Sequence, residues 1–141
     1  MKREIQKKRG QISTEYLIIL AFVTFIIVGI LGTALIYSSE IKDSIKFGQI
    51  ESFAKKIIAS SESVFYSGEP SITTINAYLP DGVTEIEISN KDLTFTVSTS
   101  SGVTKISYTS SVTIQGSISA SSGLKKLRIS ATPGTTLIQE M

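Results

Sequence analysis

The residues that could take part in chemistry gather at one junction near the start of the chain. Basic residues 7–9 run into Gly10, polar residues 11–15 follow, and a long apolar run begins at Tyr16. This order, basic then polar then apolar, indicates a precursor that is cut on the cytoplasmic side of the membrane. Because the cut would precede the apolar run, the mature protein would keep that run as a structural part.

The remaining side chains offer little for catalysis. The chain has no cysteine and no histidine, which excludes disulfides, thiolate metal sites and nucleophilic catalysis that depends on histidine within one chain. Its aspartates are Asp43, Asp81 and Asp92, and they are not clustered in the sequence. We therefore predict that the protein is not an enzyme and that it has no catalytic residues, no metal site and no cofactor.

The formal net charge of +2 is unevenly distributed along the chain. The first ten residues carry about +4, so the rest of the chain carries about −2. A basic patch confined to one end of a chain indicates membrane topology and not a nucleic-acid surface. We therefore expect no nucleic-acid partner.

Residues 16–37 form an apolar run of 22 residues without a charge. As a helix this run would span about 33 Å, which is enough to cross the core of a bilayer. The basic residues before it place the N-terminus in the cytoplasm and the rest of the chain outside. Two other interpretations stay open, an ordinary secretory signal peptide and a plain single-span anchor.

Small residues inside the apolar run are candidates for helix–helix packing. Gly29 and Thr33 lie four residues apart, with Gly32 between them. Small residues at this spacing let a second membrane helix approach closely. The alternative is that glycine is simply common in membrane helices.

The helical pattern continues beyond the apolar run but becomes amphipathic over residues 38–66. Charged residues separate apolar positions that recur at helical spacing, namely Ile41, Ile45, Phe53, Ile57, Ile58, Val64 and Phe65. We predict one long helix over residues 11–66, ended by Gly68 and Pro70. Its second half needs a partner for the apolar stripe.

The pattern changes to period two over residues 71–141, which predicts about six to eight short strands. Glu85 and Glu87 alternate with isoleucines, so we expect these acids to point outward. The basic cluster Lys125-Lys126-Leu127-Arg128 is expected on the solvated face of a strand, and the alternative is contact with an acidic surface or lipid headgroups. The predicted fold class is α+β, a long helix with a small antiparallel β-sandwich or barrel-like C-terminal domain. Alternation does not give the order of the strands.

The junction Gly10-Gln11-Ile12-Ser13-Thr14-Glu15 resembles the class III signal peptide of archaeal type IV pilins. In that family a glutamine follows the cleavage site, and a serine and a glutamate follow at alternate positions, as Gln11, Ser13 and Glu15 do here. The basic leader and the apolar helix fit the same plan. The resemblance implies a pilin-like fold, a leader at residues 1–10 that is removed between Gly10 and Gln11, and a β-rich extracellular domain.

The resemblance also implies a structural subunit of a type IV pilus that assembles through its N-terminal helix for surface adhesion. Its partners would be other pilin subunits, a prepilin peptidase, an assembly ATPase, a membrane platform protein and, before assembly, the cell membrane. Glu15 would pair with the free amine of Gln11 in an adjacent subunit, or would simply be favoured by the dipole at the start of the helix. Ser13 would be read by the peptidase or would cap the helix. The alternative is a single-span membrane-anchored β-domain that acts as an adhesin or binding module without polymerising.

Overall fold

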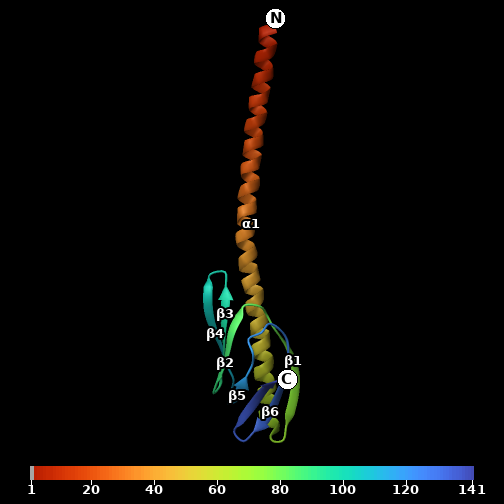
Figure 1. Cartoon of the computed structure of the whole chain (residues 1–141), viewed down its shortest axis with the longest axis vertical. Coiled ribbons are helices and arrows are strands. Elements are labelled where there is room, and N and C mark those ends of the chain that lie inside the picture. Colours follow the sequence, from red (N-terminus) through yellow and green to blue (C-terminus); the bar gives the residue numbers. More distant parts are fainter. Residues whose placement is uncertain (1) are drawn as a thin grey trace. The chain divides into compact units, whose positions relative to one another are not determined.

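The chain consists of one long helix followed by a β-rich domain (Figure 1). The structure is a computed structural model that describes residues 2–141, with side chains from Ser13 onward. The helix α1 spans Lys2–Ser67. The strands are β1 (Ile72–Leu79), β2 (Val83–Ser89), β3 (Asp92–Thr99), β4 (Gly102–Thr109), β5 (Ile114–Ser117), β6 (Gly123–Thr132) and β7 (Thr135–Glu140). The predicted α+β class, with its N-terminal helix and C-terminal β-domain, is confirmed.

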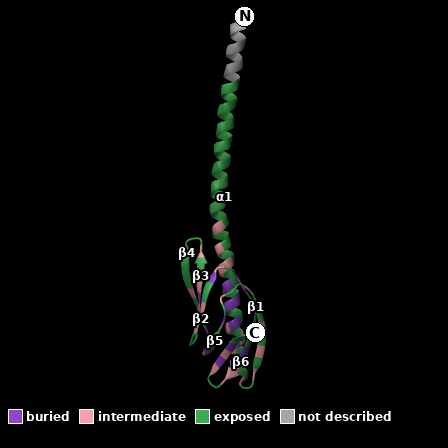
Figure 2. Cartoon of the chain, in the orientation of Figure 1, coloured by how far each residue is buried: buried purple, intermediate pink, exposed green. Residues whose placement is uncertain are grey.

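The chain divides into two units, one up to Ile41 and one from Lys42 onward. In the first unit, the side chains from Ser13 to Ser38 are all exposed, as the green helix in Figure 2 shows. The second unit holds the rest of α1 together with all seven described strands. Each unit is therefore described separately below.

Strands β2, β3 and β4 form an antiparallel sheet in that order. The residues Leu93, Phe95 and Val97 of β3 are buried, whereas the polar residues between them face outward. Strand β2 follows the same alternation, with Glu85 and Glu87 exposed as the sequence predicts. This sheet therefore has one apolar face and one polar face.

A second sheet has the order β1-β6-β7-β5. Its first three strands are antiparallel, but β5 runs parallel to β7, so the expected antiparallel arrangement is wrong at this edge. Gly116 makes the parallel pair possible. Its φ is +140°, and a Cβ on it would lie 2.0 Å from the carbonyl oxygen of Ile138. Only a glycine lets the two backbones come this close.

Both sheets pack against the second half of α1 in one core. The buried helix residues recur at helical spacing and are Ile50, Phe53, Ala54, Ile57, Ser61 and Val64. Phe53 contacts Phe95 of β3 edge to face, with ring centroids 6.0 Å apart. The helix thus supplies the apolar partner that a small β-domain needs.

The prediction that the apolar stripe of the helix begins at Ile41 is wrong. Ile45 is 57% exposed and Ile41 is also exposed. At 100° per residue, Ile45 lies about 140° around the helix from the buried Ile50, so it cannot share the same face. The helix end agrees better with expectation, because Gly68 has φ 74° and donates its N–H to the carbonyl of Phe65 at 3.1 Å.

The prediction that the basic cluster of residues 125–128 lies on a solvated face is wrong for one of its three basic residues. Lys126 and Arg128 are exposed, but Lys125 is only 6% exposed. Its Nζ donates to Glu140 Oε1 at 2.7 Å and to the hydroxyls of Ser119 and Ser121 at 2.5 and 2.6 Å. Three acceptors satisfy the buried ammonium group.

Candidate assembly site

The candidate site is the part of α1 that carries the apolar run. All large apolar side chains of residues 16–37 are exposed, up to 77% for Phe25. This part of α1 is long and apolar enough to cross a membrane, and none of its most apolar stretch is buried. An exposed apolar surface of this size marks a membrane or partner contact, because water would not stabilise it.

The polar side chains within the apolar run are satisfied by the helix itself. The Thr24 hydroxyl donates to the carbonyl of Leu20 at 2.8 Å. The Thr33 hydroxyl donates to the carbonyl of Ile30 at 2.9 Å and also reaches that of Gly29 at 3.3 Å. These hydroxyls therefore carry little cost in a lipid bilayer or a bundle of apolar helices.

Gly29, Gly32 and Thr33 share one face of α1, since residues three and four apart lie on the same side of a helix. A Cβ at Gly29 or Gly32 would meet nothing within 4 Å. The structure thus places the three predicted packing residues on one open strip. A second helix could approach closely along this strip.

The predicted recognition residues lie at the start of the same helix. Ser13 and Glu15 are both exposed, while Gly10 and Gln11 lie outside the residues whose side chains the structure describes. Among residues 13–141, the ion pairs are Lys46–Asp43, Lys55–Glu51 and Lys125–Glu140. Within that range the Glu15 carboxylate therefore has no cation beside it.

Two further carboxylates on α1 hold loops of the β-domain. Asp43 Oδ2 accepts bonds from the N–H and hydroxyl of Ser100, at 3.0 and 2.5 Å. Glu62 Oε1 accepts the N–H of Ser111 at 3.0 Å and also its hydroxyl. The hydroxyl and then the backbone N–H of the serine lower the pKa of each carboxyl. Helical spacing marks Asp43 and Glu62 only as polar positions, so no signal in the sequence names their serine partners.

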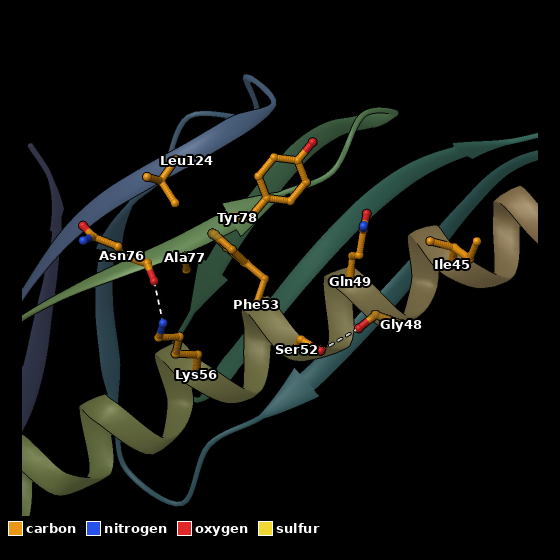
Figure 3. Close-up of a pocket in the computed structure, with 10 residues that line it drawn as sticks. All are labelled: Ile45, Gly48, Gln49, Ser52, Phe53, Lys56, Asn76, Ala77, Tyr78 and Leu124. Carbon is orange, nitrogen blue, oxygen red and sulfur yellow. Dashed lines mark hydrogen bonds between the residues drawn. The ribbon is translucent and has the colours of Figure 1, made fainter.

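A shallow groove of about 620 Å³ lies in the second unit between α1, β1 and the start of β6 (Figure 3). Phe53, Ala77, Tyr78 and Leu124 give it an apolar surface. The Lys56 Nζ in the groove donates to the carbonyl of Asn76 at 2.6 Å, as the dashed line in Figure 3 shows. The groove has no acid in its lining, and residues 13–141 contain no cluster of three potential metal ligands.

The chain matches no protein-family model, and neither a curated protein nor a solved structure is significantly similar to it.

Proposed function

We propose that this protein is the precursor of an archaeal type IV pilin, a structural subunit that assembles into a surface filament for adhesion. The observation that carries the proposal is the wholly exposed apolar helix that directly follows the Gly10-Gln11-Ile12-Ser13-Thr14-Glu15 junction. Such a helix can rest in the membrane as a precursor and then pack with its copies in a filament core. The β-domain would face outward from the filament.

Removal of residues 1–10 supports assembly on electrostatic grounds. The leader carries about four positive charges, which would be costly to place in a low-dielectric bundle of apolar helices. The cut would also create a free amine at Gln11, four residues before Glu15. An unpaired Glu15 in such a bundle would cost about 2.5–3.5 kcal/mol. We propose that the Gln11 amine of an adjacent subunit neutralises Glu15 and sets the assembly register.

The sequence inventory favours a structural role over catalysis, because histidine and cysteine are absent from the chain. The partners in this proposal are other copies of the chain, a prepilin peptidase, an assembly ATPase and a membrane platform protein. The precursor would lie in the cell membrane with its N-terminus in the cytoplasm and its β-domain outside.

The N-terminus of the protein recovered from the cell surface tests the proposal. Intact mass and terminal peptide sequencing should find a chain that starts at Gln11, free or cyclised. A matched variant, Gly10→Leu, should remain uncut and stay in the membrane fraction, whereas Arg9→Lys should be processed normally.

Recovery of a chain that retains residues 1–10 would contradict the proposal and support a single-span anchor that presents a β-domain as an adhesin or binding module. A start beyond residue 37 would instead indicate an ordinary secreted protein. Electron microscopy of the same preparation should show filaments that contain the processed chain.

A further inference from the structure

The outer face of the sheet β1-β6-β7-β5 is basic. Lys126 and Arg128 of β6 are exposed on it, because the residues that alternate with them, Lys125, Leu127 and Ile129, are buried. The one acid on these four strands is Glu140, whose carboxylate binds the buried Lys125. Among residues 13–141, neither Lys126 nor Arg128 has an ion-pair partner. The face therefore has two exposed positive charges and no acid to balance them.

The outer face of the sheet β2-β3-β4 has the opposite charge. Glu85, Glu87 and Asp92 are exposed, and they face outward because the residues that alternate with them, Ile86, Ile88 and Leu93, pack against the core. Lys105 is the one base on these three strands. Asp92 accepts the Thr109 hydroxyl at 2.7 Å, but none of the three acids forms an ion pair within residues 13–141.

The two faces also match in spacing. Lys126 and Arg128 are two residues apart on one strand, as are Glu85 and Glu87, so each pair is separated by about 7 Å along its strand. On β6 the exposed Leu124 precedes Lys126, whereas on β4 the exposed Val103 lies next to Lys105 and two strands away from Glu85. The match between the two faces therefore lies in the spacing of the charged pairs.

We propose that the basic face of β6 binds the acidic face of β2 and β3 in a second copy of this chain. Within one copy both sheets turn their apolar faces to the same core, so neither outer face can reach the other. A contact between two different faces is heterologous, and it continues from copy to copy instead of closing as a dimer. This inference deepens the proposed function, because it adds a contact between β-domains to the packing of the apolar helices.

Disulfide trapping in cells tests the contact with the full chain. The native chain has no cysteine, so engineered cysteines are the only ones present. Gln139 is the register partner of Arg128, and Thr94 is the register partner of Glu87. With Gln139→Cys and Thr94→Cys in one chain, mild oxidation should give a ladder of dimers, trimers and longer species. Each single-cysteine variant should give no ladder.

Charge exchange then tests whether electrostatic attraction holds the two faces together. Lys126→Glu with Arg128→Glu, or Glu85→Lys with Glu87→Lys, should lower the yield of the ladder by about tenfold, because like charges would meet. All four substitutions in one chain should restore it. Lys105→Glu makes the same change in charge as Arg128→Glu but lies on the acidic face, so it should not lower the yield.

The outcomes separate this contact from the proposed function. Filaments without a ladder would overturn the contact and leave the pilin proposal standing. A ladder without filaments or processing would support the contact and overturn the pilin proposal. A ladder that the four substitutions together fail to restore would also overturn the contact, since the basic face would then bind something other than the acidic face.

Discussion

Three loop serines each donate both a backbone N–H and a hydroxyl to one carboxylate. Ser100 binds Asp43 and Ser111 binds Glu62, both on α1, while Ser119 binds Glu140 on β7. A carboxylate that accepts several such bonds is stabilised in its charged form. Burial alone would raise the pKa of Glu140, but the bonds from Lys125 and Ser119 outweigh it and lower that pKa. In this domain rich in serine and threonine, single acids thus fix loops to the helix and the sheet.

These bonds predict that the protein is less stable in acid. The pKa of Asp43 and of Glu62 is lower in the folded chain than the ordinary values of 3.8 and 4.5. The unfolded chain therefore binds more protons in the acid range, and the free energy of unfolding rises with pH. The stabilisation is complete above about pH 5 and is lost as pH falls through the lowered pKa values.

Denaturation of the full chain in detergent micelles between pH 3 and pH 7 should show this slope. Glu62→Gln should reduce the slope because the titrating group is removed. Glu87→Gln is a suitable control, since its carboxylate is exposed and has no ion-pair partner within residues 13–141. An equal slope in the Glu62→Gln variant and the unmodified chain would contradict the prediction.

Gly116 should be the least replaceable glycine of the β-domain. Its φ of +140° and a Cβ position 2.0 Å from the Ile138 carbonyl oxygen mean that Gly116→Ala must separate β5 from β7. We expect a loss of about 3 kcal/mol in the free energy of unfolding. Gly102→Ala is the matched control, because φ is +129° there but nothing lies within 4 Å. Hydrogen exchange of the β7 amides should increase in the Gly116 variant alone, and equal exchange in both would contradict the clash.

Among the elements, β6 is joined to β7 by the Lys125–Glu140 ion pair, and Lys125 also bonds to Ser119 and Ser121 in the loop before β6. Lys125→Met keeps most of the side-chain volume but leaves Glu140 and the two serines without the ammonium group. Removing one partner of a buried pair is destabilising, and since Glu140 is partly exposed we expect about 2 kcal/mol. Thermal denaturation should show the loss for Lys125→Met and little change for the exposed Lys126→Met. Equal melting temperatures for the two variants would mean that the pair adds nothing.

The apolar half of α1 makes a prediction about assembly. Gly29 lies on an open strip in the single chain, where a Cβ meets nothing within 4 Å. Gly29→Leu should therefore leave the chain stable in the membrane, and it should even favour the helix by about 0.8 kcal/mol. If a second helix packs on this strip, the same change should lower the filament yield by about tenfold. Val28→Leu, at a neighbouring exposed position, should assemble normally. Loss of filaments in both variants would contradict the prediction that a second helix packs specifically on the strip that contains Gly29.

The sequence predicts elements better than it predicts their partners. The change to period two predicts about six to eight strands over residues 71–141, and the structure has seven there, because alternation directly encodes which side chains are buried. Alternation does not encode which strand lies beside which, so the parallel β5–β7 pair was missed. Lys125 was missed for a related reason, since its burial depends on Glu140, which is 15 residues away and on another strand.

At the scale of the whole molecule, the two units expose different kinds of surface. The unit up to Ile41 presents apolar side chains from residues 16–37 to the surroundings. The unit from Lys42 buries its apolar residues in its own core and exposes separate basic and acidic faces. In the proposed filament, such a chain would form two independent sets of contacts, one through the apolar helix and one through charge. Single changes in one set should therefore leave the other intact.

Substitution of Glu15 tests whether a polar contact also sets the register between neighbouring apolar helices. Its carboxylate is exposed and has no cation beside it within residues 13–141, and an unpaired acid is costly in an apolar environment. Glu15→Ala removes that cost, so the variant should enter the membrane at least as well as the unmodified chain. It also removes the proposed partner of the Gln11 amine, so under this proposal filament growth should slow by about tenfold or more. Pulse-labelled chain can be followed from the membrane fraction to sheared filaments to separate the two effects.

Glu40→Gln is the control. Glu40 is also an exposed acid on α1 but lies beyond the apolar run, so this variant should behave like the unmodified chain. Filaments of Glu15→Ala that grow at the normal rate and resist dissociation equally well would show that the helices pack without this pair.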